Sequence, residues 1–185
     1  MTARTCLLIL AFIAAFPVNA RSLSEVEKQD LAVLAQRYEA AYLKRNYWFL
    51  GASVPPRVMK RYVEGRGAAD MKPDRWVALF VADSKEVERQ IGATIETFEL
   101  NFDRARFEEA ADGEPYAILP SVSVVALRDG NRFELKSPYL ALIDGGKWYL
   151  INVGFGGTMG SVKGIYPSFD EIEFDYARQR PLKGN

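Results

Sequence analysis

The stretch YAILPSVSVVALRDGNRFELKSPYLALIDGGKWYLINV, residues 116–153, decides the fold. It holds three runs rich in β-branched and aromatic residues, which favour strands. Asp129-Gly130-Asn131 and Asp144-Gly145-Gly146 separate the runs, and Asp-Gly pairs in such places are typical of hairpin turns. Pro120 and Pro138 predict a sheet edge, a bulge or another irregularity, because proline has no N–H for the ladder. The stretch therefore predicts antiparallel strands joined by tight turns.

A further strand is expected directly before this stretch. Phe98, Leu100 and Phe102 alternate with polar residues, which is the two-residue period of a half-buried strand. Asp112-Gly113 then provides another turn signal. Together the four runs predict a curved antiparallel meander of about four strands.

Three helices are predicted before the strands. The first begins at overlapping capping boxes of Ser22 and Ser24 and runs to about Arg45, where NYWFLG (46–51) ends it with an aromatic cluster. The second is PRVMKRYVEG (56–65), with proline at its start and glycine at its end.

The third predicted helix starts near Asp70 or Asp74, either of which could cap it, and Gly92 ends it. Its expected buried stripe consists of Trp76, Leu79, Phe80, Val87 and Ile91. Helices first and strands second, without β-α-β alternation, predict an α+β class and one domain over residues 21–185. The glycine-rich GFGGTMGS (154–161) is expected to be a flexible connection. It fails as a phosphate loop because Met159 stands where the dinucleotide fingerprint needs its last glycine.

Residues 1–20 have the layout of a cleaved secretory signal peptide. Arg4 precedes an apolar run from Cys6 to Phe16, and the small residue Ala20 precedes the expected cut before Arg21. The run is too short for a membrane span, which needs about 20 apolar residues, although an uncut anchor is the alternative. We therefore expect a periplasmic or secreted protein whose mature form has no membrane span.

Composition excludes several classes of function. The chain has no histidine, so imidazole bases, Ser–His or Cys–His nucleophiles and the usual zinc sites are excluded. The single cysteine, Cys6, is removed with the signal peptide, so no disulfide is expected. Lys and Arg number 24 and Asp and Glu number 24, interleaved along the chain, so no nucleic-acid partner is predicted. Neither a metal nor a cofactor is predicted.

The helix order and the meander resemble the nuclear transport factor 2-like, or cystatin-like, α+β superfamily. More closely, the chain looks like a set of exported bacterial proteins without assigned activity. The segments that carry the resemblance are PPRVMKRYVEGRG (55–67), YAILPS (116–121), YLALIDGGKWYLINV (139–153) and YPSF (166–169). The resemblance implies a cone of helices and sheet with a pocket at its wide end. It implies no particular chemistry, since none of these segments is a catalytic motif.

Asp83 is the candidate catalytic residue. It falls on the apolar face of the third helix, so burial in a pocket would raise its pKa and make it a general acid or base. Two other interpretations compete with this one. Asp83-Ser84-Lys85-Glu86 reads as a capping box that would interrupt the helix, and Asp83 could also be a plain rim position.

Glu96 is the second acid to weigh, because it shares the face of Phe98 and Leu100 and could pair with Asp83. One residue of register slip would instead send Glu96 to solvent. Aromatic residues could line the pocket, although side chains of this kind more often form a core. They are Tyr38, Tyr42, Trp48, Trp76, Tyr116, Tyr139 and Trp148, with Tyr42, Trp76, Glu96 and Tyr139 as the candidate pocket residues.

Two functions from different classes follow. The first is an exported binding module for a small apolar ligand, a peptide or a protein partner, for which the aromatic cluster Tyr47-Trp48-Phe49 could supply an exposed patch. The second is a small acid–base enzyme of isomerase or dehydratase type that uses Asp83 with a tyrosine hydroxyl. The binding module is favoured. A homodimer through the open sheet face is left open.

Overall fold

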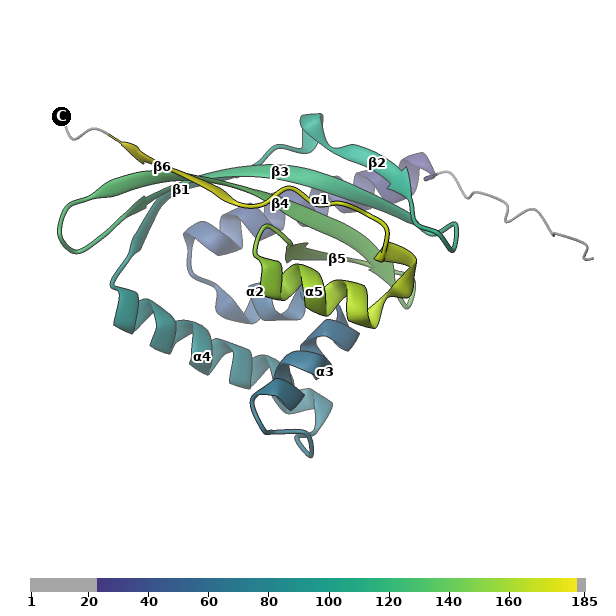
Figure 1. Ribbon diagram of the computed structural model, residues 1–185, viewed down its shortest axis with the longest axis horizontal. Coiled ribbons are helices and arrows are strands. Elements are labelled where there is room, and N and C mark those ends of the chain that lie inside the picture. Colours follow the sequence, from purple (N-terminus) through teal and green to yellow (C-terminus); the bar gives the residue numbers. More distant parts are fainter. Residues whose placement is uncertain (1–22, 183–185) are drawn as a thin grey trace, which may run out of the picture.

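The computed structural model describes residues 23–182 of the chain, and the predicted signal peptide lies outside the described residues. The described part is α+β, with a curled antiparallel sheet and helices before and after it (Figure 1). The strands are β1 (Thr94–Leu100), β2 (Arg106–Glu109), β3 (Pro115–Ala126), β4 (Arg132–Asp144), β5 (Lys147–Asn152) and β6 (Arg178–Leu182). The helices are α1 (Glu25–Leu43), α2 (Tyr47–Ala52), α3 (Pro56–Gly65), α4 (Trp76–Ile91) and α5 (Gly156–Ile165). Short 3-10 turns are η1 (Pro73–Arg75), η2 (Phe102–Arg104) and η3 (Pro167–Phe169).

The long hairpin of β3 and β4 is the centre of the sheet. The path β1-β3-β4-β5 contains the meander that the sequence predicts, while β2 adds to β3 and β6 adds to β4. The prediction of about four strands missed these two short strands. Phe102, expected at the end of the first strand, lies in η2 instead.

Pro120 and Pro138 face each other across the β3–β4 ladder, inside the sheet and not at its edge. Each has a carbonyl that accepts a hydrogen bond on the outer side of the hairpin, from Asn101 N at 2.9 Å and from Val153 N at 3.0 Å respectively. The N–H and C=O of one strand residue point to the same side. The nitrogen of each proline, which carries no hydrogen, therefore faces a gap between two neighbouring strands. Pro120 lies at the gap between β1 and β2, and Pro138 lies at the gap between β5 and β6.

Both faces of the sheet carry a core. On one face, α1 and α2 pack over side chains that include Leu119, Tyr139 and Leu150. On the other face, α5 and the segment after it cover side chains that include Ile118 and Leu140. Helical and chain segments thus cover part of each face, while Val122 and Val124, on the same face as Ile118, stay half-buried toward the hairpin tip.

Gly154 allows the backbone that follows β5 to pass very close to β4. A β-carbon there would lie 2.2 Å from Ser137 Oγ and 3.0 Å from Pro138 Cδ. Only glycine fits such a contact without moving its neighbours. Directly after it, the predicted flexible connection proves wrong, because Gly156–Ile165 forms α5 with Val162 fully buried.

Local signals placed some helix ends well. Ser24 caps α1 in a capping box with Glu27, and α3 spans the ten residues predicted for it. Within residues 23–182, four helices precede the sheet where three were expected, because residues 47–52 form α2. The Asn46 side chain caps α2 by accepting from Phe49 N at 3.2 Å.

The third predicted helix is α4, which Gly92 closes in the left-handed conformation at φ 63°. Neither Asp70 nor Asp74 caps it, since Arg75 is the N-cap residue and no side-chain cap bond is present. The helix continues through Asp83, so the interrupting capping box does not form.

The buried stripe expected on α4 is also wrong, since Val87 is 52% exposed, Ile91 is 58% exposed, and Trp76, Leu79 and Phe80 are only half-buried. The buried residue of this helix is Val81. The reason lies in the packing, because α4 contacts mainly α2 and α3 and stands away from the sheet. In Figure 1 it lies below the tip of the β3–β4 hairpin.

Candidate functional site

A hollow lies between the helices and the sheet, and it extends from the face that α1 and α2 cover to the β5 edge beside α5. It consists of two adjoining compartments of about 700 Å³ and 520 Å³, which share Tyr38, Tyr42, Tyr62 and Phe80 as lining residues. The larger, called here the α3 compartment, also touches α3, the end of β5 and α5. The smaller, the α4 compartment, reaches the tip of the hairpin. Volumes of this size fall within the range of ligand pockets in proteins, about 300–1,000 Å³.

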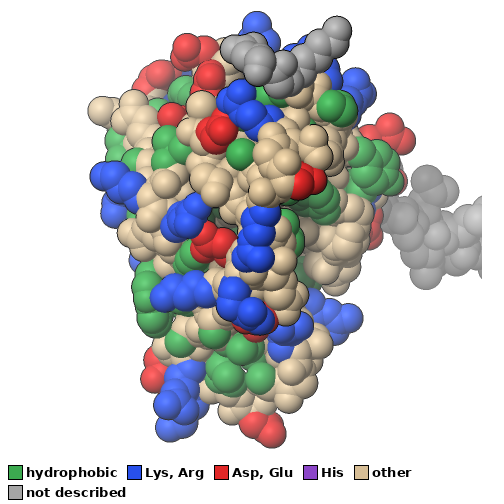
Figure 2. All heavy atoms as spheres, turned by 90° about the vertical axis from the view of Figure 1, so that its left-hand side faces the viewer, with side chains coloured by type: hydrophobic (Ala, Val, Ile, Leu, Met, Phe, Trp, Pro, Cys, Tyr) green, Lys and Arg blue, Asp and Glu red, His purple; other side chains and the backbone are tan. Residues whose placement is uncertain are grey.

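Most of the hollow's lining is apolar. In the α3 compartment the apolar contribution includes Val54, Val58, Met59, Leu150, Ile151 and Phe155. In the α4 compartment it includes Leu50, Val87, Ile91, Ile95, Val125, Leu127, Phe133 and Leu135. The hairpin extends past α1, so inward-facing side chains near its tip meet the hollow instead of a helix. On the face shown in Figure 2, hydrophobic side chains are exposed among charged side chains of both signs.

Three tyrosines from α1 and β4 form the wall where the compartments meet. Tyr38 and Tyr139 are buried and meet edge to face, with ring centroids 5.5 Å apart. Tyr42 is half-buried and stacks on Phe98 at 4.0 Å. The spacing of Tyr38 and Tyr42 along one helix places both rings on the same side of α1.

The hydroxyl of Tyr139 is the centre of a polar network in this wall. Side-chain hydrogen bonds join it to Tyr38 and to Asn152. The Asn152 Oδ1 atom in turn accepts from Ser137 Oγ at 2.7 Å and from Gly154 N at 2.9 Å. Tyrosine hydroxyls are protonated at neutral pH, and burial raises the pKa of the Tyr38 and Tyr139 phenols further above the ordinary value of 10.0. The wall therefore offers neutral hydroxyl groups to a ligand.

Asp83 lines the α4 compartment, but its environment differs from the predicted one. Arg66 Nε lies 2.8 Å from Asp83 Oδ2, and the Tyr62 hydroxyl donates to the same oxygen. The hydrogen bond from Arg66, followed by that from Tyr62, lowers the pKa of the Asp83 carboxyl. The expectation of a raised pKa is therefore wrong, because a cation from the end of α3 reaches this carboxylate.

Glu96 and Trp76 lie outside the walls of both compartments. The β1–β3 register shifts between Ile95 and Thr97, and this bulge turns Glu96 to the exposed side, where it forms an ion pair with Arg132. Hence Glu96 does not pair with Asp83. The Trp76 indole donates to Met71 O at 2.8 Å. Tyr42 and Tyr139 are the two candidate pocket residues that the structure brings together.

The remaining aromatic candidates have separate roles. Tyr116 packs against Phe169 on the other face of the sheet, and the Trp148 indole donates to Glu27 O at 3.0 Å. Within residues 47–49, Trp48 alone is strongly exposed, at 57%. The Tyr47 hydroxyl donates to Glu88 Oε2 at 2.8 Å.

Several lining residues were missed from the sequence. The clearest are Phe80, which was assigned to the core, and Val125, Leu127, Phe133 and Leu135 at the hairpin tip. The four hairpin residues alternate with their neighbours in the sequence. A comparison of the length of the hairpin with the length of the covering helices could have shown that the tip of the hairpin is uncovered.

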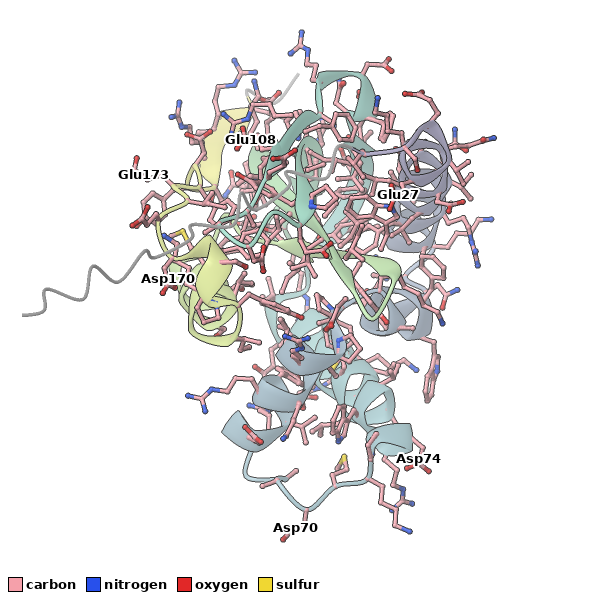
Figure 3. All side chains as sticks on the ribbon, turned by 90° about the vertical axis from the view of Figure 1, so that its right-hand side faces the viewer. Glu27, Asp70, Asp74, Glu108, Asp170 and Glu173 are labelled. Atoms are coloured by element: carbon pink, nitrogen blue, oxygen red, sulfur yellow. The ribbon has the colours of Figure 1, made fainter. Side chains whose placement is uncertain are left out.

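No metal centre or membrane-spanning helix is found between residues 23 and 182. Within that part, no three His, Cys, Asp or Glu side chains gather as a metal site would require. Figure 3 shows labelled carboxylates on separate elements, such as Asp70 and Asp74 beside the loop before α4 and Glu108 on β2. No described helix is long and apolar enough to cross a membrane.

Comparison with known proteins returned no match. No protein-family model, curated protein or solved structure is significantly similar to this chain.

Proposed function

We propose that this protein is an exported binding module that holds a small apolar ligand in the hollow between α4 and the sheet. The observation that carries the proposal is a pair of adjoining, mainly apolar compartments that share Tyr38, Tyr42, Tyr62 and Phe80 as lining residues. We propose that an elongated apolar molecule occupies both compartments. We further propose that the fold is nuclear transport factor 2-like and that export follows cleavage before Arg21.

The chemistry of the wall supports a ligand that is mainly apolar with few polar groups. Apolar surface moved out of water contributes about 25 cal/mol per Å². Hydrogen-bonding groups at one point of the wall would orient such a ligand, since pockets of this kind use few polar contacts for specificity. The Tyr139 and Asn152 side chains supply that point.

The acid–base enzyme has less support. A general acid or base that acts near neutral pH needs a pKa near the working pH. The Asp83 pKa is instead lowered by Arg66 and Tyr62, and Glu96 is turned away to Arg132. A protein partner at residues 47–49 also has less support, because Tyr47 and Phe49 are half-buried.

Binding of the neutral fluorescent probe N-phenyl-1-naphthylamine to the purified protein tests the proposal. We expect saturable binding of one probe per chain. Thr158 on α5 lines the α3 compartment, so Thr158→Trp should narrow it and weaken binding about tenfold, equal to about 1.4 kcal/mol. Thr97→Trp, at an exposed position of β1, is the matched control and should bind as the parent does.

Native mass spectrometry of the protein purified from its host would detect a retained ligand. N-terminal sequencing of the same material should begin at Arg21. Absence of saturable probe binding, together with only the bare chain mass in the native spectrum, would exclude the binding proposal. A chain that begins at Met1 would exclude the export proposal alone.

A further inference from the structure

Arg61 on α3 stands between the apolar hollow and a second, polar groove. The groove has a volume of about 710 Å³ and runs between α3 and α5. Arg61, Gly157 and Ser161 line both the groove and the α3 compartment. A molecule in the hollow could therefore continue into the groove past the Arg61 side chain.

The groove carries more positive than negative side chains. Arg57, Lys60 and Arg61 line it, against the single carboxylate of Glu64. Arg57 has a partner elsewhere, since its guanidinium lies 3.3 Å from Asp144 Oδ1. The groove therefore depends on Glu64 to balance two further cations.

Glu64 balances them only loosely. Lys60 Nζ lies 3.9 Å from one Glu64 oxygen and Arg61 lies 4.0 Å from the other, both at the outer limit of an ion pair. The Arg61 side chain is also 69% exposed. One carboxylate shared by two cations leaves about one positive charge in excess, which matches a single anionic group.

The opposite end of the hollow has no such excess of positive charge. Asp83 and Glu88 line the α4 compartment, where Arg66 pairs with Asp83 and Arg45 pairs with Glu88. An anionic group is therefore favoured at the α3 end and not at the α4 end. The charge distribution thus gives the bound molecule a direction.

We propose that the ligand is a single-chain carboxylic acid, with its apolar tail in the hollow and its carboxylate at Lys60 and Arg61. The proposal deepens the binding function proposed above and rests on it. Arginine suits a carboxylate because its planar guanidinium can donate two parallel hydrogen bonds to the two oxygens. A monocarboxylate matches the excess of about one charge, whereas a phosphate monoester carries close to two.

Displacement of N-phenyl-1-naphthylamine by three compounds with the same chain tests this inference. Dodecanoate, dodecanol and dodecyltrimethylammonium are compared below their micelle-forming concentrations. We expect dodecanoate to displace the probe at a concentration about threefold to tenfold lower than dodecanol, as expected for partly exposed charge pairs. Added salt should reduce this preference.

Three variants separate the charge contribution from the apolar one. Lys60→Gln combined with Arg61→Gln should abolish the preference for dodecanoate while leaving dodecanol unchanged. Glu64→Gln should increase the preference, because it frees both cations. Arg104→Gln, at an exposed position of η2 that lines neither the groove nor the hollow, removes a cation elsewhere and should have no effect.

The outcomes distinguish the two proposals. Probe binding with equal displacement by dodecanoate and dodecanol would overturn the carboxylate inference and leave the binding function standing. A preference for dodecyltrimethylammonium would overturn it as well. A lack of probe binding, together with only the bare chain mass in the native spectrum, would remove both proposals.

Discussion

A β-carbon on Gly51 would lie 2.8 Å from Cδ1 of Phe80, so α2 and α4 meet at a point where only glycine fits. Phe80 is also one of the residues that line both compartments of the hollow. The close contact between the two helices therefore fixes the position of a ring in the candidate site.

Gly51→Ala should destabilise the protein by roughly 1–2 kcal/mol, because overpacking outweighs the helix propensity that alanine adds. Gly160→Ala in α5 is the control, since no atom lies within 4 Å of its β-carbon, and it should be neutral or slightly stabilising. Urea unfolding followed by tryptophan fluorescence measures both. Adding Phe80→Leu to Gly51→Ala should recover part of the loss. If Gly51→Ala is as stable as the parent, the ring moves aside at little cost.

Local sequence signals predicted the elements whose ends are set by nearby residues. Pro56 and Gly65 bound α3, and Gly92 ends α4, because proline and glycine act through their own backbone. The α2 helix was missed because its six residues are too few to show a helical period.

The candidate site was harder to predict because it depends on contacts between distant residues. Periodicity placed Val87 and Ile91 on one face of α4 but could not show that this face meets a hollow. A bulge cannot be read from alternation, so Glu96 was assigned to the wrong side. The pKa of Asp83 depends on Arg66, which belongs to another element.

Asp83→Asn should lower the free energy of unfolding at pH 7 by roughly 1–2 kcal/mol, through loss of the Arg66 and Tyr62 interactions. The folded-state pKa of Asp83 lies below the ordinary value of 3.8. The contribution of the Asp83 carboxylate to the free energy of unfolding is therefore fully present above pH 3.8. The contribution is lost as the pH falls through the folded-state pKa. The two proteins should therefore converge in stability in acid.

Chemical unfolding at several pH values measures this convergence, with Asp70→Asn, at an exposed loop position, as the control. A difference between Asp83→Asn and the parent that changes near pH 7 would contradict the lowered pKa. It would also revive the acid–base hypothesis.

The buried tyrosines should make the protein sensitive to alkali. Burial raises the folded-state pKa of Tyr38 and Tyr139 above the ordinary value of 10.0, so their stabilising effect is complete below that pH. It is lost as the pH rises toward the folded-state pKa. Phenolate absorbance above pH 10 should be lower in the folded protein than in urea, and should appear together with unfolding.

Tyr139→Phe should lower the free energy of unfolding by about 1 kcal/mol at neutral pH, because the hydrogen bonds of the hydroxyl are lost. Above pH 10, its free energy of unfolding should fall less steeply than that of the parent. Tyr176→Phe is the control because Tyr176 is exposed, and its alkaline profile should match the parent. Full ionisation of the tyrosines before any loss of circular dichroism would contradict the raised pKa of the buried phenols.

Ile91 at the rim of the α4 compartment offers a test that separates binding from stability. Its side chain is largely exposed, so Ile91→Ser should change the free energy of unfolding by less than about 0.5 kcal/mol. A ligand in the hollow would cover this side chain, and losing its apolar surface should weaken binding of N-phenyl-1-naphthylamine by about threefold to tenfold. Val33→Ser, at an exposed position of α1 outside both compartments, is the matched control and should leave probe binding and the free energy of unfolding unchanged. If Ile91→Ser binds the probe as tightly as Val33→Ser and the parent do, the ligand does not reach the α4 compartment, and binding is confined to the α3 compartment.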